Sequence, residues 1–151
     1  MSINPGLEAN HSHTVHDQDL AIHWGGDMPV LASPVLIGLF EETCVKATDH
    51  LLPANRSTVG VGFDLLHISP TPAGSTVQIS AHLKEVKGKK LTFDVDAHDS
   101  FGLIATGVLH RSIVKTASFL DKVQAKLDQR DRGCTEEPKP VERKPGRERP
   151  A

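Results

Sequence analysis

The chain has 151 residues, a formal net charge of −2, and 38% hydrophobic and 24% charged residues, a composition typical of one domain large enough to bury a core. Cys44 and Cys134 lack a CxxC spacing, so we expect neither a disulfide framework nor a zinc site, and a reducing, cytoplasmic setting fits best. No apolar run approaches the roughly 20 residues of a membrane span, and the N-terminus lacks the pattern of an export signal, so we expect no membrane partner.

The N-terminal segment is polar at first and then partly apolar. Residues 1–12 are rich in turn formers, and we expect them to be frayed. No carboxylate or cysteine at fixed spacing completes a metal site with the nearby histidines, so we assign no metal to His11, His13 and His16. Apolar and polar residues alternate toward the end of residues 14–24, which predicts a first strand there, and the strand ends before a pair of glycines.

The longest helical pattern before the C-terminal part begins at Ser33 and runs through Val45. A serine at a helix start can accept a backbone N–H, and a proline there gives up a donor that has no partner, so Ser33-Pro34 is a start signal. Apolar residues cover more than one stripe of this helix, as expected when a sheet surrounds it: Val35, Leu36, Ile37, Leu39, Phe40, Cys44, Val45 and Ala47. We therefore predict a central, predominantly buried helix.

Four strand patterns follow the helix, at residues 57–69, 76–86, 91–97 and 103–114. Short turns join the last three, so a strand, a helix and four antiparallel strands make an α+β layout. In the first of the four patterns one face carries Val59, Val61, Phe63, Leu65 and His67, and the other face carries Gly60, Gly62, Asp64 and Leu66. His67 thus shares the apolar face.

The C-terminal part has a short helical pattern followed by a charged tail. Residues 118–127 predict a helix that packs at an edge of the sheet through Phe119, Leu120, Val123 and Leu127. Beyond Asp128 the chain has almost no apolar content, and alternating charges favour a solvated, disordered tail over a nucleic-acid-binding arm. We therefore divide the chain into a frayed segment (1–12), one domain (13–128) and a disordered tail (129–151).

Two adjacent carboxylates on the central helix have different surroundings. Glu41 has apolar or small neighbours one turn away in both directions, whereas Glu42 can pair with Lys46. Burying a carboxylate costs several kcal/mol unless the group is paired or used, and burial tends to raise its pKa toward the range of a general base. Glu41 is therefore either a functional group or a structural carboxylate bonded to backbone or to a partner subunit.

The sequence does not decide whether Ser33 and His67 are functional or structural when each is considered alone. A lone histidine on an apolar strand face is more often a core or interface residue than a catalyst. A helix cap explains Ser33, and no GxSxG motif surrounds it to indicate a hydrolase nucleophile. A helix held against an antiparallel sheet can, however, bring a hydroxyl, a carboxylate and an imidazole to one cleft.

Several segments resemble the fluoroacetyl-CoA thioesterase group of the hotdog-fold superfamily, at residues 32–45, 67–74, 86–91, 97–99 and 107–111. The resemblance covers about residues 14–127 and implies an antiparallel sheet wrapped around a central helix, followed by a short C-terminal helix. In that group a Thr, a Glu eight residues later and a His 26 residues after the Glu form the catalytic set. Ser33, Glu41 and His67 have these spacings. Gly60 would lie where a backbone N–H meets the substrate carbonyl.

The resemblance implies hydrolysis of an acyl-CoA thioester to a free acid and CoA. Glu41 would be the general base or the nucleophile, Ser33 a positioning group and His67 a general acid or base. CoA would be a substrate, and neither a cofactor nor a metal is implied. A homodimer joined edge to edge, with sites at the subunit interface, is implied as well. The CoA phosphates would bind among Lys84, Lys87, Lys89, Lys90 and Arg111.

The chain departs from the group at two places. Serine replaces the threonine, which keeps the hydroxyl but drops the methyl group that restricts its rotamer. Residues 25–28, Gly-Gly-Asp-Met, stand where the fluoroacetyl-specific member has an aromatic gate, so the acyl group is left open.

Two alternative functions remain. An enoyl-CoA hydratase-type hotdog enzyme is disfavoured, because Asp64 and His67 alternate to opposite strand faces. A non-catalytic acyl-CoA-binding dimer would keep the cleft and tolerate loss of the polar groups.

Overall fold

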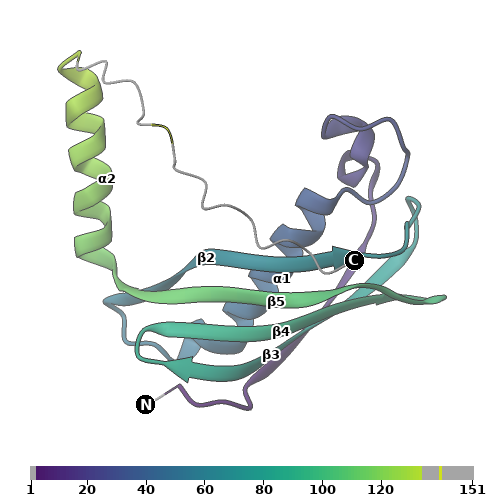
Figure 1. The fold of residues 1–151 in the computed structure, drawn as a ribbon, viewed down its shortest axis with the longest axis horizontal. Coiled ribbons are helices and arrows are strands. Elements are labelled where there is room, and N and C mark those ends of the chain that lie inside the picture. Colours follow the sequence, from purple (N-terminus) through teal and green to yellow (C-terminus); the bar gives the residue numbers. More distant parts are fainter. Residues whose placement is uncertain (1–2, 134–139, 141–151) are drawn as a thin grey trace.

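The computed structural model describes residues 3–133 and residue 140, and the described residues form a five-stranded antiparallel sheet and two α-helices (Figure 1). The strands are β1 (Glu8–Thr14), β2 (Arg56–His67), β3 (Thr76–Lys87), β4 (Lys90–Asp99) and β5 (Gly102–Lys115), and the helices are α1 (Ser33–Thr48) and α2 (Thr116–Asp131). Their order across the sheet is β1-β3-β4-β5-β2, so β1 and β2 are the edge strands. The predicted α+β layout, including its last three strands and their short turns, is confirmed.

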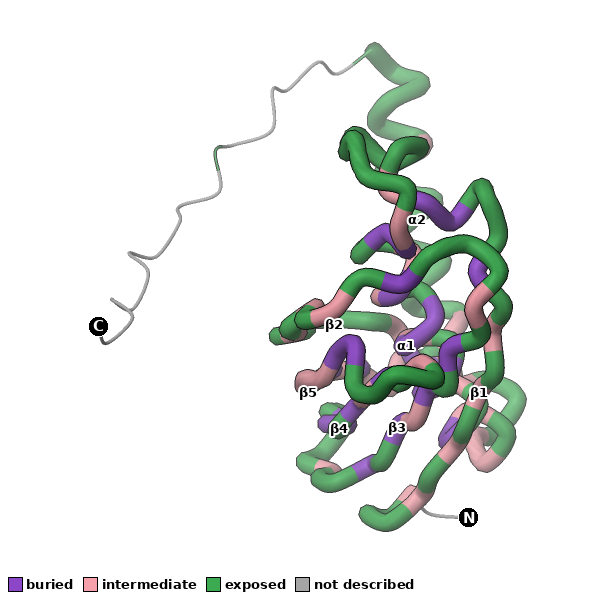
Figure 2. The backbone as a smooth tube through the Cα atoms, turned by 90° about the vertical axis from the view of Figure 1, so that its right-hand side faces the viewer, coloured by how far each residue is buried: buried purple, intermediate pink, exposed green. Residues whose placement is uncertain are grey.

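α1 lies across one face of the sheet and forms the core with the strands that face it (Figure 1). Phe40 of α1 is fully buried against side chains of the central strands, which include Phe93 and Leu109. Buried residues follow α1 and the strands beneath it, whereas α2 is exposed (Figure 2). The sheet therefore wraps around a central helix, as predicted for a hotdog fold.

The helix begins where the sequence predicts, but Ser33 does not cap it. Ala32 occupies the capping position with an extended backbone, and Ser33 and Pro34 already belong to the first turn. No side chain makes a capping hydrogen bond at this end. The Ser33 hydroxyl is therefore free to make another contact.

The first strand lies earlier than predicted. β1 pairs with β3 from Glu8 opposite His82 to Thr14 opposite Thr76. The prediction of a frayed segment is therefore wrong for residues 8–12, and the predicted strand at 14–24 is wrong because two short 3₁₀ turns occupy residues 17–23. The less exposed positions of β1 carry Ala9, His11 and His13, so the strand shows no apolar alternation that a hydrophobic pattern could detect.

A β-bulge interrupts β2. Gly60 is opposite Arg111 and Gly62 is opposite His110, the neighbouring residue of β5, so Val61 is an extra residue without a partner. Side chains alternate between the two faces of a strand, and one extra residue shifts this alternation by one position beyond the bulge.

The bulge corrects the predicted alternation of β2. Before it, Thr58 and Gly60 face α1, since Thr58 is buried and a Cβ on Gly60 would meet Glu41. After it, Phe63 and His67 line a pocket together with residues of α1. Gly60 therefore shares a face with His67, and the prediction that Val61 does so is wrong.

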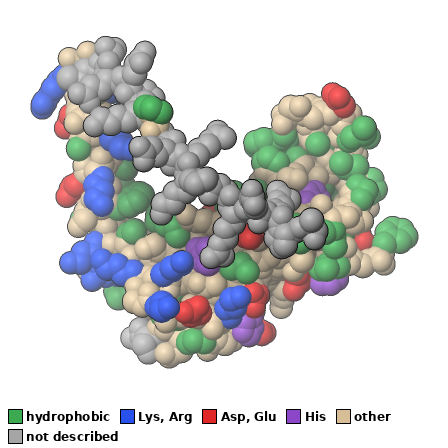
Figure 3. Space-filling model, in the orientation of Figure 1, with side chains coloured by type: hydrophobic (Ala, Val, Ile, Leu, Met, Phe, Trp, Pro, Cys, Tyr) green, Lys and Arg blue, Asp and Glu red, His purple; other side chains and the backbone are tan. Residues whose placement is uncertain are grey.

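α2 extends away from the end of β5 and packs little against the sheet (Figures 1 and 3). None of its residues is buried, and the exposed fractions are 39% for Phe119, 57% for Leu120 and 43% for Val123. The prediction that this helix packs at a sheet edge is therefore wrong for the single chain. No described helix has the length and hydropathy of a membrane span. Most of the predicted disordered tail, from residue 134 onward except 140, lies outside the described residues.

Candidate active site

Ser33 and His67 meet where α1 begins and β2 ends. The Ser33 Oγ lies 2.7 Å from the His67 Nδ1, a hydrogen-bond distance. The other ring nitrogen, Nε2, is buried and has no hydrogen-bond partner among the described residues. Buried polar atoms are almost always paired, so this nitrogen is available to a ligand.

Burial sets the protonation state of His67. It lowers the pKa of the imidazole below its ordinary value of 6.5, and a backbone hydrogen bond with Ser69 raises the pKa by a smaller amount. The ring is therefore neutral near pH 7, with one nitrogen carrying a proton and the other able to accept one. The imidazole can serve as a proton donor or acceptor through Nε2, depending on its tautomer.

Two apolar pockets adjoin the Ser33–His67 pair. One, of about 290 Å³, lies between α1 and β2 and is lined by Leu36, Ile37, Phe40, Phe63 and Leu65 in addition to the pair. The other, of about 280 Å³, is lined by Ala21, Val30, Leu31, Ile68 and Pro70 and again by the pair. Ser33 and His67 thus lie between two pockets whose lining suits an apolar part of a ligand rather than a charged group.

Glu41 lies on the same helix but not beside this pair. Eight residues separate it from Ser33, a rise of about 12 Å along α1. The Glu41 side chain is 40% exposed, so the prediction that it is buried holds only relative to Glu42, which is exposed. Within one chain the structure brings Ser33 and His67 together and leaves Glu41 apart.

Gly60 lies directly under the Glu41 carboxylate. A Cβ atom built on Gly60 would overlap the Glu41 Oε1, whereas a Cβ on Gly62 would make only an ordinary contact of 3.7 Å with the His110 ring. Glycine at position 60 thus allows the backbone and the Glu41 carboxylate to approach closely, and a larger side chain would displace the carboxylate. Gly60 and Glu41 therefore belong to one cluster.

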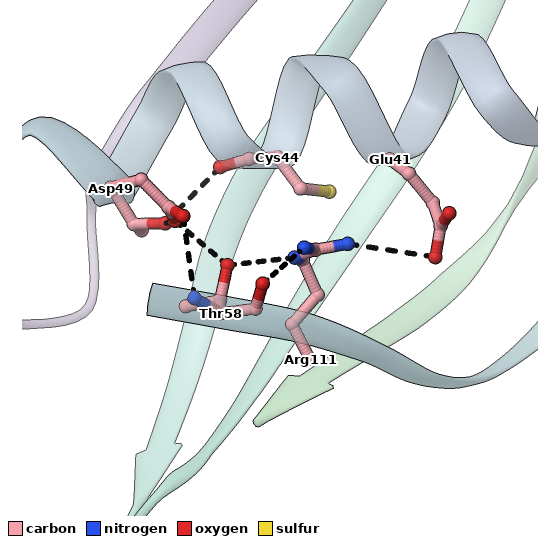
Figure 4. Close-up of polar contacts among 6 residues, drawn as sticks. Glu41, Cys44, Asp49, Thr58 and Arg111 are labelled. Carbon is pink, nitrogen blue, oxygen red and sulfur yellow. Dashed lines mark hydrogen bonds and ion pairs between the residues drawn. The ribbon is translucent and has the colours of Figure 1, made fainter. Parts of the chain in front are cut away.

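Arg111 completes this second cluster, and the sequence reasoning missed its role. Its Nη1 lies 3.5 Å from the Glu41 Oε1, while its Nε and Nη2 donate to the Thr58 side-chain and backbone oxygens at 2.9 and 2.8 Å (Figure 4). The Thr58 hydroxyl in turn donates to Asp49 at 2.8 Å. Arg111 is 6% exposed, so its charge faces the interior of the protein and not the surface positions predicted to bind the CoA phosphates. The sequence could have indicated this role, because Arg111 is a charged residue at an inward-facing position of β5.

Cys44 lies between these groups but is not a nucleophile. Burial raises the pKa of its thiol to about 12, with a smaller lowering by Arg111 and a smaller raising by Glu41. The thiolate is the reactive form of cysteine, so Cys44 is inert at neutral pH. Among the described residues no group of His, Cys, Asp or Glu could hold a metal ion.

An antiparallel sheet wrapped around one helix is the hotdog fold, and in this chain polar groups on the helix and on an edge strand lie beside apolar pockets. A hot-dog-like protein from Thermanaerovibrio acidaminovorans has this fold, with a TM-score of 0.77 at 21% identity over 82% of this chain and 93% of its own.

Closer relatives identify the family within this fold. The family model described as fluoroacetyl-CoA-specific thioesterase matches residues 15–117. The fluoroacetyl-CoA thioesterase of Streptantibioticus cattleyicolor is 33% identical over 97 residues, which make up 64% of this chain and 70% of that protein. A solved structure of the fluoroacetyl-CoA thioesterase FlK has a TM-score of 0.79 at 27% identity, over 83% of this chain and 98% of its own. This chain belongs to the fluoroacetyl-CoA-specific thioesterase family and is a thioester hydrolase.

The Arg111 network yields a prediction for stability. Thr58→Val keeps the side-chain shape but removes the hydroxyl that links Arg111 to Asp49, so the buried Arg111 Nε–H loses its acceptor and the Asp49 carboxylate loses a donor. We expect a loss of about 1–3 kcal/mol in the free energy of unfolding, measured by urea denaturation. Thr106→Val is the control, because that hydroxyl makes only a 3.5 Å contact with a backbone oxygen. Equal losses in the two variants would contradict the network.

His67 yields a prediction for the pH dependence of stability. Because its pKa is lower in the folded protein than its ordinary value of 6.5, the unfolded chain binds this proton more tightly. The folded state should therefore lose stability as pH falls through 6.5 and below, and His67→Gln should remove that part of the loss. The urea concentration at the unfolding midpoint, measured at pH values from about 8 to about 5, gives this pH dependence of stability. His50→Gln, at an exposed histidine, is the control, and identical pH profiles for wild type and His67→Gln would refute the assignment.

Proposed function

We propose that the protein hydrolyses an acyl-CoA thioester to a free acid and CoA, and that Glu41, Ser33 and His67 carry the reaction. The observation that carries this proposal is the 2.7 Å contact between Ser33 and His67, whose buried Nε2 has no partner among the described residues. Membership of the thioesterase family supports it. The acyl chain would lie in the apolar pockets beside the pair.

A second copy of the chain is part of the proposal, because one chain leaves Glu41 about 12 Å from Ser33. In the described chain β2 pairs with β5 alone and forms an edge of the sheet. It exposes 56% of Val61, 56% of Phe63 and 63% of Leu66. An apolar edge strand is a template for pairing, so two copies would join along β2 into one continuous sheet.

One register of such a dimer would bring the Ser33–His67 pair of one chain close to Glu41 of the other. Antiparallel pairing of two β2 strands around a twofold axis between Phe63 and Asp64 sets Gly60 of one chain opposite the partner's His67. Gly60 lies under Glu41, so the partner's Ser33–His67 pair would adjoin that carboxylate. Each site would then use the carboxylate of one chain and the hydroxyl and imidazole of the other.

The chemistry follows from these positions. Glu41 would remove a proton from water as the water oxygen attacks the thioester carbonyl carbon, or would attack that carbon itself. The tetrahedral intermediate would collapse by cleavage of the carbon–sulfur bond, with His67 passing a proton to the departing sulfur. After attack by water, Glu41 and His67 would regain their starting protonation by exchange with solvent. After attack by Glu41 itself, a water molecule would hydrolyse the resulting mixed anhydride, which releases the acid and the Glu41 carboxylate and returns a proton to His67. Ser33 would position the imidazole or the substrate through its hydroxyl.

Negative charge on the carbonyl oxygen also needs donors. The backbone N–H of Gly60 and the free N–H groups of the first turn of α1 are the candidates, and a helix N-terminus favours negative charge. One donor to a developing oxyanion contributes about 10²–10³ in rate. Arg111, held by Thr58, would orient the Glu41 carboxylate rather than touch substrate.

The acyl group of the proposed substrate is not restricted to fluoroacetyl. The pocket nearest residues 25–28 has no aromatic side chain among its described lining residues. Trp24 and Met28 are 56% and 65% exposed. Residues 25–28 have no aromatic side chain, and Trp24 does not line this pocket, so we expect acyl groups of several sizes to be accepted.

Release of free thiol from a panel of acyl-CoAs tests the proposed function. Glu41→Gln and His67→Ala should each lower kcat/KM by about 10²–10⁴, because each removes a proton-transferring group. Ser33→Ala should lower it less, and Glu42→Gln, at the exposed neighbour, should leave it unchanged. Turnover that is absent for every acyl-CoA, or undiminished in both Glu41→Gln and His67→Ala, would overturn the proposal.

A pair of glycine variants tests the position of the Glu41 carboxylate. Gly60→Ala places a methyl group where the Glu41 Oε1 lies, and the flexible carboxylate should move away with little loss of stability. We expect kcat to fall at least tenfold, about 1.4 kcal/mol in the barrier, while the urea midpoint stays near that of wild type. Gly62→Ala is the matched control, since its methyl group makes an ordinary contact. Wild-type kcat in Gly60→Ala would contradict the assigned position.

A further inference from the structure

A third pocket, of about 320 Å³, lies where α2 leaves the sheet, away from the Ser33–His67 pair. Its polar and aromatic lining comes from three elements: Lys89 of the β3–β4 turn, Ser112 and Lys115 of β5, and Ser118, Phe119 and Lys122 of α2. Lys and Arg side chains gather on this side of the molecule (Figure 3).

The local structure holds these lysines together. Phe119 and Lys122 are three residues apart on α2, so they share one face of the helix, and Lys115 ends β5 directly before that helix. The Ile113 N–H donates to the Lys89 carbonyl at 2.8 Å, which ties the β3–β4 turn to β5. The Thr116 N–H donates to the Asn55 carbonyl at 3.1 Å and fixes the start of α2.

The positive charge of this pocket is not neutralised by the described residues. None of the described lining residues is acidic, and none of the described carboxylates forms an ion pair with Lys89, Lys115 or Lys122. Three of the other four candidates for binding CoA phosphates are engaged: Lys84 pairs with Asp94 at 3.0 Å, Lys87 with Glu85 at 3.8 Å, and Arg111 with Glu41 at 3.5 Å. The fourth, Lys90, lines a different pocket together with Lys84 and Lys87. Three like charges around one hollow favour binding of an anion.

Phe119 makes this a pocket for a nucleotide rather than for any anion. Its ring is 39% exposed in the same hollow as the three lysines. Aromatic rings beside cationic groups bind bases by stacking, while lysines and hydroxyls bind the phosphates. Ser112 and Ser118 supply the hydroxyls.

The distance to the reacting groups fits a CoA thioester. Lys115 is four residues along β5 from Arg111, which contacts Glu41, a separation of about 13 Å. The pantetheine arm of CoA has as many chain bonds as about four amino-acid residues and spans about 14 Å. A carbonyl at Glu41 would therefore set the CoA phosphates beside Lys115.

We propose that this pocket, through Lys89, Lys115, Lys122 and Phe119, holds the 3′-phosphorylated ADP end of CoA. This inference rests on the proposed function, since it takes the thioester to react at Glu41. The three lysines bind the phosphates, and Phe119 stacks on the adenine.

Calorimetric binding of free CoA and of adenosine 3′,5′-bisphosphate tests the proposal without any turnover. Lys89→Gln, Lys115→Gln and Lys122→Gln should each weaken both ligands about tenfold, as loss of a charge-assisted hydrogen bond does, and the triple variant should weaken them more. Lys126→Gln is the matched control, on the same helix but outside the pocket. Wild-type affinity in the triple variant, or an equal loss in Lys126→Gln, would overturn the proposal.

Phe119 separates a nucleotide pocket from a general anion patch. Phe119→Ala should weaken CoA at least fivefold and leave binding of inorganic pyrophosphate unchanged, and Phe119→Tyr should keep wild-type affinity. Undiminished CoA binding in Phe119→Ala would refute the stacking. Failure of the proposed function looks different: wild-type protein would bind CoA through these lysines yet hydrolyse no acyl-CoA.

Discussion

The β-bulge at Val61 decides which side chains of the edge strand face the central helix. One extra residue sets Gly60 and His67 on the same face, although they are separated by an odd number of positions. Because Gly60 lies under Glu41 and His67 bonds to Ser33, the bulge aims both polar clusters at the face that α1 covers. A regular strand would turn one of the two clusters away from α1.

The two clusters differ in how they are held. Arg111 is bonded to both oxygens of Thr58, and Thr58 is bonded to Asp49, so the guanidinium facing Glu41 is fixed from behind. His67 is held by Ser33 on one ring nitrogen, and its other ring nitrogen is left to a ligand. Rigid support and an unpaired polar atom are what a preorganised site requires. In the proposed dimer the two kinds of group meet across the subunit boundary.

Periodicity predicted the central helix and the last four strands, because apolar residues mark the core-facing positions of these elements. The family's residue spacing singled out Ser33, Glu41 and His67, and the structure places the first and last of them in contact. Periodicity could not show the bulge, since glycines on both sides of Val61 carry no side chain to reveal it. It missed β1 because histidines occupy inward positions, and it missed Arg111 because Thr58 is distant in sequence.

The central claim is that Glu41 of one chain acts with Ser33 and His67 of another. Mixing Glu41→Gln and His67→Ala proteins under conditions that exchange subunits tests this claim most directly, with acyl-CoA hydrolysis as the readout. A shared site predicts recovery to about a quarter of wild-type activity, since half of randomly mixed dimers contain both chains and each of these holds one intact site. Activity that stays at the level of the two separate variants, although mixed dimers are present, would contradict the claim.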